Sequence, residues 1–328
     1  MYTSSLSCSE GEKRSALLVL VRHGETTANA TNILQGQCDF PLTDKGISEA
    51  VALGRALKNK NWVHVVSSDL SRARDTAQII LSQRENDKDE SDDDGIHLFS
   101  LTERLRESSF GLRDGLPIGT TIPEAIRIVA EQKGIPESEL VDNSETHAQV
   151  VLRANHFLLD LVRMLDESDE SPPAAAGLTP TTIAQQQRNV LCVAHGGFIR
   201  IFLTALVQNL PGHAPKIKNT GVSGILLKWE AGNSGSSLVC EASSDDMSRI
   251  NCTPHLDGAA AVLSSGGGGA AAGGGGAEGE GGGSAAASTA ASCATTTALT
   301  SSSSSNATNS SRPNNAADVI EDYFPWII

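Results

Sequence analysis

The sequence predicts an α/β fold, a three-layer sandwich in which helices flank a mostly parallel sheet. One reason is that short, continuous apolar runs, typical of strands buried on both faces, alternate with longer stretches of helical apolar spacing. The other is that three of these runs end in polar or cationic residues: Arg22-His23, Ser68-Asp69 and His195. Ligands of such sheets bind where the strands end, so this edge is predicted to carry the functional site.

The elements follow from the spacing of apolar residues. The first strand is predicted over residues 16–21, because this run is apolar throughout and stops at Arg22. A helix is expected to begin at Thr43, which can cap its first turn, and apolar residues follow at helical spacing from Ile47 to Leu57. Further strands are predicted at 62–66, 96–101, 189–194, 222–229 and 238–242, and further helices at 70–81, 120–131, 144–165 and 198–207.

The 328-residue chain divides by composition into one folded domain and a tail. Residues 16–257 mix apolar, charged and turn residues as a folded domain does, after a flexible N-terminus at 1–15. Two flexible insertions are expected inside the domain, in the acidic run near 85–95 and in the Pro- and Gln-rich stretch 168–188.

The tail has two parts. Residues 258–317 are almost entirely Gly, Ala, Ser, Thr and Asn, with too few apolar side chains to offset the entropy of ordering the backbone, so they are expected to be disordered. Residues 318–328 are instead apolar and aromatic. They could dock on the domain or serve as a tethered peptide for a protein partner, and the second interpretation is the preferred expectation.

Charge and cysteine content exclude several classes of function. A net charge of -14 argues against a broad nucleic-acid-binding face. The six cysteines are scattered and form no CxxC pair, so neither a disulfide framework nor a zinc site is predicted. No segment is apolar and long enough for a membrane span, and the first residues lack the apolar core of a signal peptide. We therefore expect a cytoplasmic protein without membrane or nucleic-acid partners.

Two histidines stand out because each follows a predicted buried strand and is itself followed by glycine, His23 and His195. A lone histidine after a strand is more often structural, and that is the expectation for the other six. Together with Arg22 and Arg72, however, the pair suits phosphoryl transfer. An imidazole can form a phosphohistidine, guanidinium groups bind phosphate oxygens, and a carboxylic acid can protonate the leaving oxygen.

A series of motifs in chain order resembles one known family. The motifs are Arg22-His23-Gly24-Glu25-Thr26, Asn29, Gln35-Gly36, Pro41-Leu42-Thr43, Ser68-Asp69-Leu70, Arg72-Ala73, Thr76-Ala77, Leu105-Arg106-Glu107, Gly111 and His195-Gly196. They resemble the histidine phosphatase superfamily in its phosphoglycerate-mutase-like branch, over residues 16–257. Within the branch, the chain looks most similar to the fructose-2,6-bisphosphatases.

The resemblance implies a role for each matching residue. It makes His23 the nucleophile, Glu107 the general acid, and His195 a phosphate ligand. It further implies phosphate or substrate contacts from Arg22, Asn29, Gln35, Gly36, Arg72 and Gly196, with Asn219-Thr220 at the pocket rim. Glu145 has two open interpretations, as part of the substrate loop or as an acid at a helix N-terminus. No metal and no cofactor are implied.

Three functions are therefore weighed. The leading one is a phosphatase of a small phosphorylated metabolite, for which the resemblance suggests fructose 2,6-bisphosphate. A phosphoglycerate mutase is the enzymatic alternative, although Ile118 stands where the mutases carry a substrate-binding lysine. A non-catalytic phosphate-binding module of the same fold is the third, and it would be expected to lack His23, Glu107 or His195.

Overall fold

The computed structural model describes residues 13–84, 99–169, 188–208, 214–230, 238–242, 249–256, 324, 326 and 327. In this part of the chain one seven-stranded sheet has the order β3-β2-β4-β1-β6-β7-β5. The strands are β1 (Lys13–Arg22), β2 (His64–Ser68), β3 (Phe99–Thr102), β4 (Arg188–Ala194), β5 (Val207–Gln208), β6 (Val222–Glu230) and β7 (Val239–Ala242). The pairings β1–β4, β2–β4, β2–β3 and β5–β7 are parallel, and β1–β6 and β6–β7 are antiparallel. The predicted mostly parallel sheet is confirmed.

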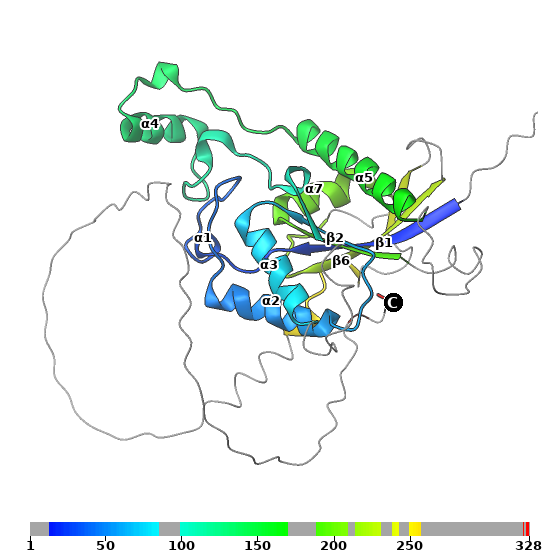
Figure 1. Cartoon of the computed structure of the whole chain (residues 1–328). Helices are drawn as coiled ribbons and strands as arrows, with labels where there is room; N and C mark the ends of the chain where they lie inside the picture. The colour runs from blue at the N-terminus through cyan, green and yellow to red at the C-terminus, as the bar shows by residue number, and fades with distance from the viewer. Residues whose placement is uncertain are drawn as a thin grey trace, which may run out of the picture. The chain divides into compact units, whose positions relative to one another are not determined.

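Helices cover both faces of the sheet, as predicted (Figure 1). The α-helices are α1 (Thr27–Ala30), α2 (Asp44–Leu57), α3 (Ser71–Ser82), α4 (Ile122–Lys133), α5 (His147–Asp169) and α7 (Gly196–Leu206). Short 3-10 turns are η2 (Glu103–Leu105), η3 (Gly111–Arg113) and η4 (Glu137–Glu139). Thr43 is the N-cap of α2, and its side chain accepts a hydrogen bond from the N–H of Gly46, as its position in the sequence predicted.

The side chains of β1 alternate between two apolar clusters, because successive residues of a strand point to opposite faces. Leu17, Val19 and Val21 pack with residues of α2 and α3, whereas Leu18 and Leu20 pack with residues of α5 and α7. Both faces of β1 are therefore buried, which explains its uninterrupted apolar sequence.

The structure corrects two of the expected boundaries. β1 begins at Lys13, so residues 13–15 belong to a strand rather than to a flexible N-terminus. Likewise, α5 extends to Asp169 and β4 begins at Arg188, which narrows the insertion expected at 168–188. The remaining residues of these segments, the insertion near 85–95 and the tail at 258–317 lie outside the described residues.

Three described residues near the end of the chain pack on the domain. Phe324 and Ile327 are fully buried in the cluster that α2 and α3 form with the sheet, and Trp326 packs against the same cluster. This supports docking on the domain over the preferred interpretation of a peptide tethered to a protein partner. Among the described helices, none combines the length and the apolar character that a membrane span requires.

Candidate active site

Three parallel neighbours, β1, β4 and β2, end side by side and bring distant residues to one edge of the sheet. Arg22 pairs with Ala194, and the N–H of His23 donates to the carbonyl of Ala194 at 3.0 Å. β6 runs in the opposite direction, so the loop before it reaches the same edge, where the N–H of Thr220 donates to the carbonyl of Arg22 at 3.1 Å.

His23 lies at this edge with only 2% of its surface exposed. Its Nδ1 is 2.7 Å from the carbonyl oxygen of Gly24. Because a carbonyl oxygen only accepts, Nδ1 carries the proton of the neutral ring and Nε2 keeps its lone pair. Burial lowers the pKa of His23 well below its usual value, and the nearby charges of Arg22 and Arg72 lower it further. The ring is therefore neutral, which is the state that a nucleophilic imidazole requires.

His195 is fully buried beside His23, with the two ring centroids 5.2 Å apart. Nε of Arg72 donates to its Nδ1 at 3.2 Å, and its Nε2 lies 2.9 Å from Oγ of Ser68. An arginine N–H only donates, so the proton of His195 sits on Nε2 and points at Ser68. Burial, followed by the charge of Arg72, lowers the pKa of His195 well below its usual value. Both ring nitrogens are thus engaged by protein groups, which the motif alone did not indicate.

The two predicted arginines differ in how they are held. Arg72 donates from Nη1 to the carbonyl of Cys38 and from Nη2 to the carbonyl of Gly36, each at 2.7 Å. Arg22 donates from Nη1 to the carbonyl of Ile217 at 2.8 Å, but its buried Nε has no hydrogen-bond partner among the described residues. Burial lowers the pKa of both arginines, and the charge of Glu107 opposes this. Since a buried cationic donor without a partner is destabilising, the site favours an anion at Arg22.

The carboxylate of Glu107 is bound at the N-terminus of α7. Its oxygens accept from the N–H groups of Ser108, Gly197 and Phe198, each at 2.8 Å. These donors hold the carboxylate toward the strand end that carries His195, since α7 begins directly after that residue. Gly197 also leaves the space that the carboxylate needs, because a Cβ there would lie 2.5 Å from Oε1 of Glu107.

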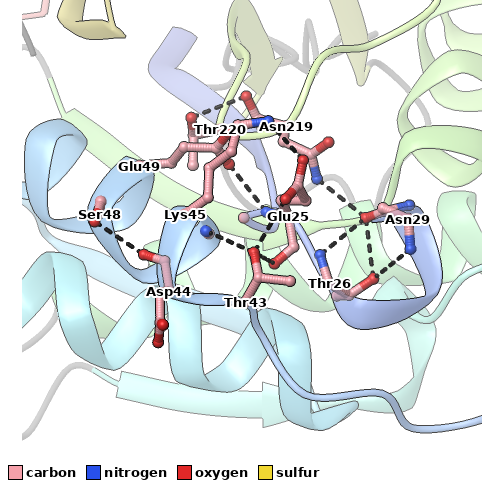
Figure 2. Close-up of polar contacts among 12 residues, drawn as sticks. Glu25, Thr26, Asn29, Thr43, Asp44, Lys45, Ser48, Glu49, Asn219 and Thr220 are labelled. Atoms are coloured by element: carbon pink, nitrogen blue, oxygen red, sulfur yellow. Dashed lines mark hydrogen bonds and ion pairs between the residues drawn. The ribbon is translucent and has the colours of Figure 1, made fainter. Parts of the chain in front are cut away.

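Asn29 and Gln35 meet at Thr26, the N-cap of α1. Oγ1 of Thr26 lies 3.1 Å from Oδ1 of Asn29 and 2.9 Å from Oε1 of Gln35. The amide oxygens of both residues therefore face Thr26 (Figure 2 shows the Asn29 contact). Asn219 joins the same cluster: its Nδ2 donates to the carbonyl of His23 at 3.1 Å and lies 3.3 Å from Oδ1 of Asn29.

The two predicted glycines shape the site through the backbone. Gly36 has a φ of +49°, and a Cβ there would fall 1.7 Å from Oδ1 of Asp114. Its carbonyl binds Arg72, so Gly36 contributes to the position of that guanidinium. A Cβ at Gly196 would lie 3.1 Å from Nε of Arg22, so glycine leaves space beside the unpartnered donor. In the described part of the chain, no group of three or more His, Cys, Asp and Glu side chains is arranged to hold a metal ion.

Comparisons with known proteins identify the family of this chain. A model of the histidine phosphatase superfamily (branch 1) matches residues 18–170. Fructose-2,6-bisphosphatase TIGAR B of Danio rerio is 37% identical over 205 residues, which cover 59% of this chain and 75% of that protein. The chain belongs to the histidine phosphatase superfamily. The family and these relatives support an enzyme that hydrolyses phosphoric monoesters.

Other relatives of this histidine phosphatase carry a different name. The probable phosphoglycerate mutase GpmB of Yersinia pestis (strain Pestoides F) is 30% identical over 245 residues, which cover 73% of this chain and 94% of that protein. The fold is also that of a phosphoglycerate mutase from Bacillus anthracis str. Sterne, at a TM-score of 0.51 and 21% identity, covering 76% of this chain and 98% of that one. The phosphoglycerate-mutase-like fold class is thereby confirmed.

Arg153 of this histidine phosphatase is a site residue that the sequence did not reveal. It donates from Nη1 to the carbonyls of Arg104 and Arg106, at 2.9 and 2.8 Å, and so fixes the segment that carries Glu107. Glu145 forms an ion pair with it at 2.8 Å. The helix that follows is capped by Thr146 and Gln149, so Glu145 is not its capping acid, and its place in the substrate loop stays a prediction. In the sequence, the one indication of this role is that Arg153 is a cation among the apolar residues of the predicted helix.

Glu49 is a second residue that the motifs did not single out. It is buried on α2, and its Oε2 accepts from the N–H of Glu25 at 2.9 Å. Burial raises the pKa of Glu49, while the Glu25 N–H bond and the charges of Lys45 and Arg22 lower it. Nζ of Lys45 donates to the carboxylate of Glu25 (Figure 2). This cluster fixes the backbone immediately after His23.

Proposed function

We propose that this histidine phosphatase hydrolyses a small phosphorylated metabolite through a phosphohistidine on His23. The observation that carries the proposal is the state of His23: a buried, neutral imidazole whose Nδ1–H is bound by the Gly24 carbonyl and whose Nε2 keeps its lone pair. Fructose 2,6-bisphosphate is the proposed substrate, supported by the similarity to TIGAR B. The scattered cysteines support the cytoplasm as its location.

The proposed reaction has two halves. Nε2 of His23 attacks phosphorus, the N–P bond forms, and the bond between phosphorus and the leaving oxygen breaks, while Glu107 gives its proton to that oxygen. Glu107 then takes a proton from water, the resulting hydroxide attacks phosphorus, and inorganic phosphate leaves with His23 restored. Arg22 and Arg72 stabilise the charge on the phosphoryl oxygens in both halves.

His195 reaches the phosphate only if its proton moves to Nδ1. Ser68 permits this change, because its hydroxyl can accept from Nε2 in one tautomer and donate to Nε2 in the other. An arriving phosphate would then take over the contact that Nδ1 makes with Arg72. For Asn29 and Gln35, we propose that the amide nitrogens contact the substrate, since the oxygens face Thr26. Gly36 and Gly196 serve the phosphate pocket through backbone shape.

The test is to trap the intermediate. Acid-sensitive, base-stable phosphate should appear on the peptide that contains His23 when turnover is quenched. His23→Ala should abolish the adduct and lower turnover roughly a thousandfold or more. His156→Ala, an exposed histidine on α5, is the matched control and should behave as the wild type. Turnover retained by His23→Ala would overturn the mechanism, and a panel of sugar and glycerate phosphates would decide the substrate.

A further inference from the structure

The loop that carries Asn219 is held in an unusual backbone conformation. Thr220 is fully buried and has a φ of +49°, a left-handed value that a β-branched residue rarely adopts. Asn219 beside it donates to the carbonyl of the nucleophile His23 and contacts Asn29. The surroundings must therefore hold this loop, and they lie outside the motifs that identify the family.

His255 supplies one of these restraints. Oγ1 of Thr220 donates to the carbonyl of Asn219 at 2.8 Å and lies 3.0 Å from Nε2 of His255. The hydroxyl has a single proton, and the carbonyl uses it, so Nε2 of His255 is the donor in the second contact. Nδ1 of His255 is buried without a hydrogen-bond partner among the described residues. No second hydrogen bond fixes the ring, so packing has to do so.

Phe324 and Trp326 supply that packing. The ring of Phe324 lies 5.9 Å from that of His255, and Trp326 meets Phe324 edge-on at 5.9 Å. Trp326 rests directly on Gly224 of β6, where a Cβ would fall 2.4 Å from the indole, and Arg249 lies 5.7 Å over its ring. Phe324 is completely buried, so this arrangement is part of the core and not a surface contact.

We propose that Phe324 and His255 are positioning residues of the phosphatase, and that Phe324 and Trp326 form a brace for its nucleophile. The brace fixes His255, His255 fixes Thr220, and Thr220 fixes the amide of Asn219 that binds the main chain of His23. Loss of any member should displace Nε2 of His23 and slow the attack on phosphorus. This inference rests on the proposed function, because it concerns the step in which His23 becomes phosphorylated.

The test is a double-mutant cycle in the full chain, read out as the single-turnover rate of phosphohistidine formation from p-nitrophenyl phosphate. Thr220→Val removes the hydroxyl at nearly constant shape, and Thr220→Ser keeps it. We expect Thr220→Val and Phe324→Ala each to slow the step about tenfold and Thr220→Ser to stay within about twofold of wild type. The two lesions interrupt one chain of contacts, so the double variant should be no slower than the slower single variant, within about twofold.

Leu57→Ala is the matched control, because Leu57 is as buried as Phe324 in the same apolar cluster but lies at the far end of α2. It should reduce stability and leave the rate unchanged, alone or combined with Thr220→Val. If Phe324→Ala does not fold, His255→Ala takes its place in the cycle. Two results would refute the brace. One is a wild-type rate of phosphohistidine formation in Thr220→Val and Phe324→Ala, and the other is a double variant whose rate falls by the product of the two single losses. Failure of the wild-type chain to form any phosphohistidine would instead refute the proposed function.

Discussion

At the scale of single residues, Gly197 decides where the carboxylate of Glu107 can lie. Its N–H binds that carboxylate, and the space of its missing side chain is occupied by Oε1 of Glu107. Gly197→Ala should displace Glu107 and lower kcat by at least about tenfold, since a positioned general acid contributes on the order of 100-fold or more. The free energy of unfolding should fall as well, by about 1–3 kcal/mol, because the N–H groups of Gly197 and Phe198 lose their acceptor.

Gly134→Ala is the matched control. Gly134 ends α4 with a φ of +65°, and nothing lies within 4 Å of a Cβ placed there. The substitution should reduce stability by about 1 kcal/mol because of the left-handed backbone, without an effect on kcat. Steady-state kinetics and denaturant titration of the two variants measure both quantities. Unchanged kcat in Gly197→Ala would show that Glu107 does not depend on this glycine.

His255 makes stability depend on pH. Burial lowers its pKa from 6.5 to about 4, so the unfolded chain accepts a proton at a pH where the folded chain does not. The free energy of unfolding should therefore fall as the pH drops from about 6.5 toward 4, by on the order of 3 kcal/mol from this residue. His255→Gln should flatten this dependence. His23 and His195 act in the same direction but remain in both proteins, so equal slopes in wild type and variant would contradict the prediction.

The sequence predicted the site residues that adjoin strand ends and missed those that act from elsewhere. Arg22, His23 and His195 could be found because a strand end and a following glycine are visible in the sequence. Arg153 could not, since the carbonyls of Arg104 and Arg106 that it binds belong to the main chain and lie far from it in the sequence. The engagement of both nitrogens of His195 was also invisible, because a sequence gives the type of a side chain but not its direction.

At the scale of elements, strands buried on both faces were the easiest to predict. Very short elements, and strand ends that depend on pairing with another strand, were the hardest. β1 and β4 are continuous apolar runs because both of their faces are covered. The two-residue β5 and the four-residue α1 are too short to show a period. The polar start of β1 at Lys13 depends on its register with Glu230 of β6, which no local pattern encodes.

The contact of β6 with Trp326 can be tested through Gly224. Gly224→Ala should push Trp326 out of place and lower the free energy of unfolding by about 1–3 kcal/mol, as overpacking of a core does. The same substitution made together with Trp326→Ala should have almost no further effect, because the added methyl group then has space. Denaturant titration of the four proteins measures this difference. If Gly224→Ala lowers the free energy of unfolding equally with and without the indole of Trp326, the prediction is wrong.

At the scale of the whole molecule, the fold fits both a phosphatase and a mutase, and the cations around the site separate them. Ile118 is 64% exposed and can bind neither a carboxylate nor a second phosphate. Losing a charged hydrogen bond there weakens substrate retention by on the order of 1.5–3 kcal/mol, so water should capture the phosphohistidine. With 3-phosphoglycerate and a bisphosphoglycerate primer, we expect mutase turnover at least about tenfold slower than phosphate release. Faster formation of 2-phosphoglycerate would favour the mutase.

One folded domain was predicted from composition, but the destination of residues 318–328 was not. Their apolar character left two interpretations open, docking on the domain or binding to a protein partner. The space on the sheet that receives Phe324 and Trp326 exists because residue 224 is a glycine. A glycine within a strand pattern has several explanations, so the sequence alone did not connect Gly224 with Phe324 and Trp326.

The central place of β1 in the sheet has a consequence for the synthesis of the protein. Leu17 pairs with Asn189 on one side and with Leu226 on the other, so its neighbours are made long after it. At 5–20 residues per second, the ribosome exposes this apolar strand for roughly 10–40 s before both partners exist. We expect nascent chains halted before residue 189 to bind chaperones of the holdase type, and chains released after residue 256 to bind them less. The same order that buries the strand preceding His23 on both faces leaves it unprotected while the chain is being made.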